Sequence, residues 1–187
     1  HAEMLERDLE LVGTDFPGGF RRYEWNQDGA TMIIDLYDPT QSPGGSFSTG
    51  FRDRLDDYTL VHYNGHSSYG SKHLLDDPDA FSDGYQILMI HSCQSYAYYT
   101  RQAFRAKATP NDPSGFDLAD IVATGKSSYP SGAPPTPRVL LSSLMYGMSS
   151  ILDGKPEDAP DWLEITEGIT DSTWGDIVYG IAGVRTN

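Results

Sequence analysis

The sequence predicts an α/β fold with a mostly parallel central sheet, and three observations support this. Three short apolar runs, at residues 58–63, 86–90 and 120–124, have the length of strands. The second run is continuously apolar, and such runs flanked by helical patterns are typical of parallel strands covered on both faces. The length of 187 residues fits one domain with a full core, so we expect residues 1–187 to form a single domain.

The N-terminal part is expected to contain a helix and a hairpin. Residues 2–12 carry apolar side chains at helical spacing among charged residues, which predicts an amphipathic helix. Residues 20–25 and the β-rich run 30–37 are separated by a stretch that ends in Asp28-Gly29, which favours a turn. These two segments are therefore predicted to form a hairpin or two short strands.

A loop and a short helix are expected next. Residues 38–46 are rich in Pro, Gly and Ser and are predicted to form a loop. Phe47, Phe51 and Leu55 recur at intervals of four, which predicts a helix over residues 46–56.

Two longer helices are predicted in the second half. The first covers residues 95–107, with Ser95 as its cap and basic residues near its C-terminal end. The second begins at Thr136 and ends before Gly154. A Pro-rich linker at 156–160 and an acidic segment of undecided structure follow, and the apolar run 177–184 is expected to be the last strand.

Composition excludes several classes of protein. The formal net charge of −14 would repel phosphate backbones over most of the surface, so we expect no nucleic-acid partner. No run approaches the roughly 18 apolar residues of a membrane helix, so no membrane span is expected. Cys93 is the only cysteine, which excludes an intramolecular disulfide. Because His1 begins inside a helical pattern without an initiator methionine or a signal peptide, we expect a processed product or an excised fragment.

Two reactive side chains follow two of the predicted strands. His66 follows the run 58–63, and Cys93 follows the run 86–90 and precedes the helix 95–107. A free thiol has a pKa near 8.5, and a helix N-terminus and a nearby histidine both favour its thiolate form. In open parallel sheets the C-terminal ends of the strands form the active-site edge. The sequence therefore predicts a Cys93/His66 catalytic pair.

Other interpretations of these residues stay open. Cys93 could be a small buried apolar residue and His66 a loop residue. His91 could act as an alternative base or be a hydrogen-bonded core histidine. A metal-dependent hydrolase could instead use the histidines His62, His66, His73 and His91.

The segment between the two strands carries an acidic cluster. Asp76, Asp77 and Asp79 could hold a structural calcium ion or form a solvated loop. No cofactor is otherwise expected.

Around these residues the chain resembles the clan CD cysteine peptidases, which include caspases, legumains, gingipains and clostripains. The resemblance lies in a strand ending in Gly65-His66, a second ending in Ser92-Cys93-Gln94-Ser95, and the run at residues 122–125, and it covers roughly residues 47–150. It implies a caspase-like three-layer sandwich and a cysteine endopeptidase acting on a protein or peptide substrate.

The resemblance also implies a role for each site residue. Cys93 would attack the scissile carbonyl, His66 would protonate the leaving amine, and backbone amides of Ser67 and Cys93 would hold the oxyanion. The pocket for the side chain before the cut would lie near Lys126, Ser127 and Ser128, where Lys126 could select an acidic side chain or be a solvated loop lysine.

The chain departs from the family at three points. Ser67 stands where the family usually has glycine after the histidine, which leaves open a non-catalytic binding or scaffold module of the same fold. The connector between His66 and Cys93 is shorter than the roughly 50 residues of caspases, so it is expected to be a loop or hairpin without a full crossover helix. The strand that usually precedes the first helix is missing, which predicts that a second chain from the same precursor supplies it.

Overall fold

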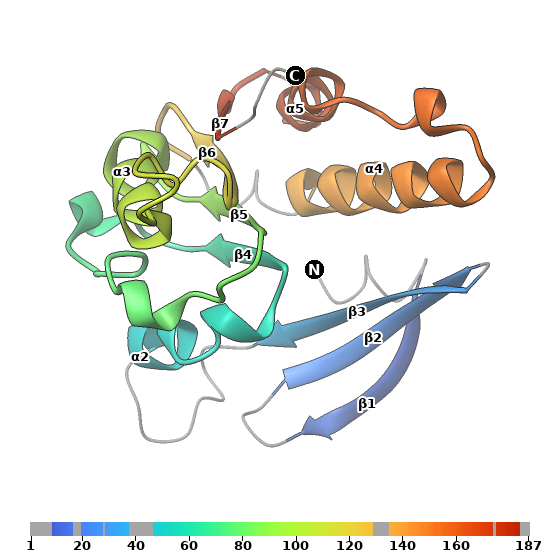
Figure 1. Ribbon diagram of the computed structural model, residues 1–187, viewed down its shortest axis with the longest axis horizontal. Helices are drawn as coiled ribbons and strands as arrows, with labels where there is room; N and C mark the ends of the chain where they lie inside the picture. Colours follow the sequence, from blue (N-terminus) through green and yellow to red (C-terminus); the bar gives the residue numbers. More distant parts are fainter. Residues whose placement is uncertain are drawn as a thin grey trace.

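The computed structural model describes residues 9–16, 20–27, 29–37, 47–128, 135–173 and 175–183. They form two sheets and four α-helices (Figure 1). The first sheet is antiparallel and has the order β1-β2-β3, with β1 at Glu10–Phe16, β2 at Phe20–Gln27 and β3 at Ala30–Tyr37. The predicted hairpin is confirmed, because β2 pairs with β3 from Phe20↔Tyr37 to Gln27↔Ala30.

The second sheet has four strands in the order β4-β5-β6-β7. The strands are β4 (Leu60–Asn64), β5 (Gln86–His91), β6 (Ala119–Thr124) and β7 (Tyr179–Ala182). β4, β5 and β6 run parallel, whereas β7 is antiparallel to β6. All six residues of β5 and all six of β6 are buried, as continuous apolar runs predict. The predicted α/β fold with a mostly parallel sheet is confirmed at this level.

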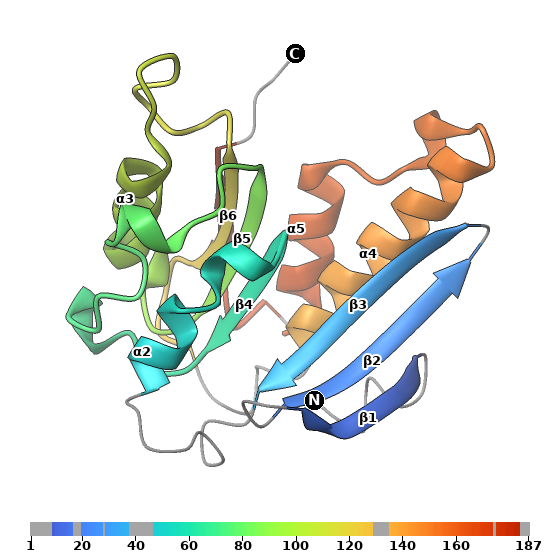
Figure 2. The same cartoon turned by 60° about the horizontal axis from the view of Figure 1, so that its bottom comes forward.

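Helices cover both faces of the four-stranded sheet (Figures 1 and 2). They are α2 (Phe47–Arg52), α3 (Ser95–Lys107), α4 (Pro135–Leu152) and α5 (Trp162–Asp171). On one face α3 contributes Tyr99, Ala103 and Phe104 to a buried cluster with residues of β4, β5 and β6. On the other face Leu140 of α4 and Ile165 of α5 pack with Met89 and Val122. The three-stranded sheet lies on the same side as α4.

The helix predicted for residues 2–12 is wrong over its last four residues, since residue 9 lies in a bend. Residues 10–12 belong to β1, where Leu11 pairs with Tyr23 of β2. Because the backbone is paired in a sheet, the helical spacing of the apolar residues does not decide the conformation there, and Leu11 and Val12 are exposed. Residues 1–8 and the predicted loop 38–46 lie outside the described residues.

Helix ends differ from the prediction in detail. Gln94, not Ser95, occupies the N-cap position of α3, and Thr136 is a buried residue inside α4. Gly154 has the positive φ of +73° expected of a helix terminator. The acidic segment contains α5, which starts with a capping box in which Asp161 and Glu164 each bond the other's backbone N–H.

The connector between β4 and β5 contains only short 3₁₀ turns, at Ser68–Gly70 and Pro78–Ala80, so the expected absence of a crossover helix is confirmed. Its far end is joined to α3 by the buried Lys107, whose Nζ donates to the carbonyls of Ser82 at 2.6 Å and Gly84 at 2.7 Å. Burial lowers the pKa of Lys107 to about 8.

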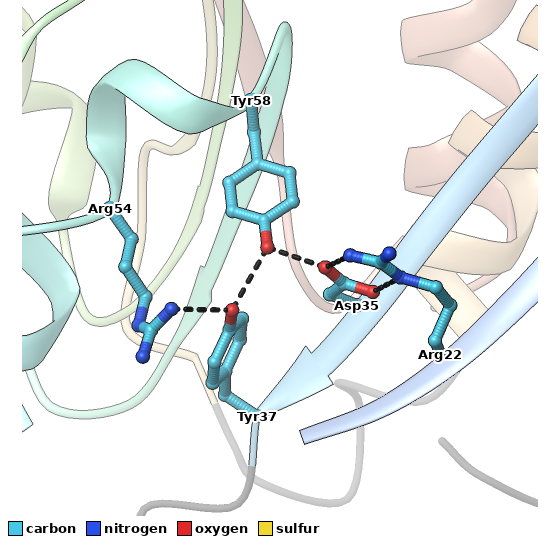
Figure 3. Close-up of polar contacts among 5 residues, drawn as sticks. All are labelled: Arg22, Asp35, Tyr37, Arg54 and Tyr58. Carbon is cyan, nitrogen blue, oxygen red and sulfur yellow. Dashed lines mark hydrogen bonds and ion pairs between the residues drawn. The ribbon is translucent and has the colours of Figure 1, made fainter. Parts of the chain in front are cut away.

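A polar network links the three-stranded sheet to the segment that leads into β4 (Figure 3). Arg22 of β2 forms a bidentate ion pair with Asp35 of β3, whose side chain is buried, with both N–O distances at 2.7 Å. Tyr58 donates to the same carboxylate at 2.6 Å and contacts the hydroxyl of Tyr37 at 2.9 Å, and Arg54 donates to Tyr37 at 3.0 Å. Burial acts to raise the pKa of Asp35, but the bonds from Arg22 and Tyr58 hold it below its ordinary value.

Among the residues described, no helix has the length and apolar character needed to cross a membrane.

Candidate functional site

The C-terminal ends of β4 and β5 lie side by side. Asn64, the last residue of β4, pairs with His91, the last residue of β5, and the N–H of Gly65 donates to the carbonyl of His91 at 3.2 Å. His66 follows one residue after Gly65, and Cys93 follows two residues after His91. The prediction that both reactive residues follow adjacent parallel strands is therefore confirmed.

Two tyrosines fix the turn that carries His66. The hydroxyl of Tyr63 donates to the carbonyl of His66 at 2.9 Å, and that of Tyr99 donates to the carbonyl of Ser67 at 2.6 Å. A Cβ atom at Gly65 would lie only 2.6 Å from the Tyr63 hydroxyl, so the absence of a side chain permits this close approach. The imidazole of His66 itself is exposed to solvent.

Ser67 occupies the position where the resembled family has glycine. Ser67 is buried, and its backbone has φ −70° and ψ −30°, a conformation open to any L-amino acid. The backbone of this turn therefore does not need glycine at residue 67.

Cys93 lies at the turn between β5 and α3. It is half-buried, and its Sγ contacts the carbonyl of Ser128 at 3.6 Å. Gln94 has a left-handed backbone with φ +52°, and its N–H donates to the carbonyl of Lys126 at 2.9 Å. The thiol thus directly precedes the positive N-terminal end of a helix of 13 residues.

A buried hydroxyl network supports this turn. Ser95 Oγ donates to the carbonyl of Ile90 at 2.6 Å and accepts the N–H of Thr124 at 2.9 Å. Thr124 Oγ1, at the end of β6, in turn donates to the carbonyl of Ser92. Sequence reasoning missed Thr124, whose signal is a hydroxyl at the end of a buried apolar strand.

An open hollow of about 380 Å³ adjoins the Cys93 turn. Its lining residues are Gln94, Gly125, Lys126, Ser127 and Asp176. The family resemblance predicts Lys126 and Ser127 at this place, and both line the hollow. Ser128, also predicted, does not line it; its carbonyl instead accepts a hydrogen bond from the Cys93 thiol. Asp176 comes from the segment between α5 and β7 and could not be assigned from sequence.

The remaining histidines have other surroundings. His91 is buried and its Nδ1 bonds the hydroxyl of Tyr179, so it is a hydrogen-bonded core histidine. Burial, with a smaller contribution from the charge of His91, lowers the pKa of His62 to about 3. His62 is therefore a neutral imidazole at physiological pH. His73 is exposed, with Nδ1 2.5 Å from an oxygen of Asp76.

Neither predicted metal site corresponds to a cluster in the structure. Within the described ranges, no group of three or more His, Cys, Asp or Glu side chains could hold a metal ion. In the acidic connector, the carboxylate of Asp77 accepts the N–H of Asp79 and caps the turn at Pro78–Ala80.

Comparison of the chain with known protein families, curated proteins and solved structures finds no match. The resemblance to clan CD peptidases expected from the sequence thus rests on its short motifs at residues 65–66, 92–95 and 122–125. Chemically, this edge of the sheet combines a thiol at a helix N-terminus, an exposed imidazole on the neighbouring turn, and an adjoining polar hollow.

Proposed function

We propose that this protein is a cysteine endopeptidase of the clan CD type, with Cys93 as nucleophile and His66 as acid–base residue. The observation that carries the proposal is the pairing of β4 with β5, which brings the turns of His66 and Cys93 to one edge, joined by the bond from Gly65 to His91. Helices on both faces of a mostly parallel sheet support a caspase-like three-layer sandwich.

The chemistry divides between the two turns. The thiol of Cys93 transfers its proton to His66, and the thiolate attacks the scissile carbonyl carbon. As the C–N bond breaks, His66 returns the proton to the leaving amine, and water then hydrolyses the acyl thioester to release the acid and regenerate the thiol. The backbone N–H groups of Ser67 and Cys93 are the proposed donors to the oxyanion.

The strand order supports a proposed direction for the substrate. The turns lie in the order of their strands, with His66 after β4, Cys93 after β5 and the loop 125–128 after β6. Because His66 protonates the leaving amine, the part of the substrate after the cut lies over the end of β4. The part before the cut lies toward β6, where the hollow lined by Lys126 and Asp176 would receive the side chain that precedes the cut.

A further strand is expected beside β4. β4 stands at the end of the order β4-β5-β6-β7 in the described sheet, which supports the proposal that a second chain from the same precursor extends the sheet.

Hydrolysis of a broad library of internally quenched peptides tests the function. Turnover by the wild-type chain, its loss in Cys93→Ala and His66→Ala, and its loss after alkylation with iodoacetamide are the expected results. His73→Ala is the matched control, because His73 is also exposed and lies in the connector. Turnover that persists in Cys93→Ala, or that disappears with a chelator, would contradict the proposal, and peptide binding without turnover would favour a scaffold module.

A further inference from the structure

The loop that follows His66 presents an exposed aromatic ring beside the candidate site. Tyr69 is three residues after His66 and is 83% exposed, more than any other large apolar or aromatic residue in the described ranges. An aromatic ring in this position buries little area in the folded chain. Core packing therefore does not account for the position of the Tyr69 ring.

The backbone of this loop is held in an unusual conformation. Ser68, Tyr69 and Gly70 all have positive φ, at +48°, +54° and +77°. Left-handed backbone costs free energy for residues other than glycine, and it persists only where the surroundings impose it. Here Ser71 Oγ donates to the carbonyl of Ser68 at 2.6 Å, and Gln102 of α3 donates to that of Gly70 at 3.4 Å.

A second, half-buried tyrosine lies against the exposed ring of Tyr69. The ring of Tyr98, on the first turns of α3, meets that of Tyr69 edge to face, with centroids 5.9 Å apart and an interplanar angle of 82°. The Tyr98 hydroxyl donates at 3.2 Å to the side chain of Gln94, the residue after Cys93. The two rings therefore connect the loop after His66 to the turn after Cys93, and we call them the tyrosine pair.

We propose that the tyrosine pair binds a large apolar or aromatic side chain of the peptide substrate on the leaving-group side of the cut. The inference rests on the proposed peptidase function, which places the residues after the cut over the end of β4. Exposed aromatic faces and edges favour aromatic and aliphatic partners. Two rings offer far less area than the roughly 1,000 Å² that a stable protein–protein interface needs, so a substrate side chain is the occupant.

Two quenched peptides that differ only after the cut test this site. Both carry the same residues before the cut, and the first two residues after it are Leu-Phe in one and Gly-Ser in the other. We expect the wild-type chain to prefer the Leu-Phe peptide by about tenfold in kcat/KM, mainly through KM. Tyr69→Asn, whose side chain tolerates left-handed backbone, should reduce the ratio of kcat/KM between the Leu-Phe and Gly-Ser peptides to about one.

Two control variants separate the ring from other effects. Tyr69→Phe keeps the ring and should keep the preference, whereas Tyr146→Asn changes a tyrosine that is 58% exposed on α4 and should behave as the wild type. Equal rates on both peptides in the wild type, or an equal loss on both in Tyr69→Asn, would overturn the proposal.

A binding measurement keeps this inference separate from the peptidase proposal. Fluorescence anisotropy with Cys93→Ala and the labelled peptides should show tighter binding of the Leu-Phe peptide, lost when Tyr69→Asn is added. Ring-dependent binding without wild-type turnover would overturn the peptidase and leave the tyrosine pair supported. Cys93-dependent turnover with equal binding of both peptides would overturn the tyrosine pair alone.

Discussion

The hydroxyl of Tyr99 donates to the carbonyl oxygen of Ser67 over 2.6 Å, and so joins the helix that follows Cys93 to the turn that carries His66. Tyr99 is fully buried, and burial, with a smaller effect of Tyr63, raises its pKa to about 12. The hydroxyl therefore stays protonated as a donor throughout the physiological range.

Removing this hydroxyl tests the coupling between the two turns. Tyr99→Phe removes one of two donors to the carbonyl of Ser67, which also accepts the N–H of Gly70 at 2.9 Å, so the free energy of unfolding should fall by about 0.5–1.5 kcal/mol. Because the amide of Ser67, the proposed oxyanion donor, is then less well positioned, kcat on a cleaved peptide should fall about tenfold with little change in KM. Urea unfolding and steady-state kinetics measure both effects, with Tyr96→Phe, on the exposed side of α3, as control. Unchanged stability would show that the bond is dispensable.

Gly65 should not tolerate a side chain. A methyl group there would lie 2.6 Å from the Tyr63 hydroxyl, so Gly65→Ala should move that ring and break its bond to the carbonyl of His66. We expect a loss of about 1–3 kcal/mol in the free energy of unfolding. Gly84→Ala is the matched control, since the nearest atom there is 3.9 Å from the new methyl. Equal thermal stability of the two variants would contradict the close packing of the His66 turn.

His62 should make the fold sensitive to acid. Its pKa is lowered from 6.5 to about 3, so between these values the unfolded chain binds a proton that the folded chain does not. Its contribution to stability is therefore complete above pH 6.5 and is lost as the pH falls toward 3, by up to about 1.4 kcal/mol per pH unit. In His62→Gln the fall in unfolding free energy between about pH 7.5 and about pH 5 should be up to about 2 kcal/mol smaller than in the wild type. The exposed His73→Gln should retain the full fall, and the same pH dependence in both variants would exclude His62 as its source.

The network of Figure 3 should stabilise the three-stranded sheet against the rest of the chain. Arg22→Gln removes the bidentate partner of a carboxylate whose side chain is fully buried, and we expect a Tm several degrees lower at neutral pH. Because the pKa of Asp35 is lowered, the benefit of the pair disappears as the pH falls below about 3.8, so the difference in Tm should shrink there. Thermal unfolding followed by circular dichroism tests this, and Arg21→Gln, an exposed neighbour, should have little effect. A difference in Tm that is constant with pH would argue against an ionic contribution.

Parts of the fold could be predicted because local signals and burial agree. Residues 86–90 and 120–124 form strands that helices cover on both faces. Their apolar sequences therefore indicate buried strands directly. The helix that ends before Gly154 has its terminator next to it in sequence. In contrast, residues 10–12 follow a helical spacing but pair with β2, a choice made by another segment of the chain.

The same distinction applies to the candidate site. The places of His66 and Cys93 follow from the ends of two apolar runs, and the sequence shows both. The buried bond from Thr124 to Ser92 and the approach of Asp176 to the hollow depend on segments that are distant along the chain. The left-handed backbone at Tyr69 is a property of the surrounding contacts, and a tyrosine gives no local sign of it.

The bonds from Lys107 to Ser82 and Gly84 have a consequence for proteolytic processing. A protease that cut the connector in the exposed stretch around Asp79 would leave the piece with β4 and the piece with β5 and α3 still associated. On one side of the cut, the fully buried Leu74 and Leu75 remain in the core, and on the other the ammonium group still holds Ser82 and Gly84. A nicked molecule would thus migrate as two bands after denaturation and as one particle in a native gel.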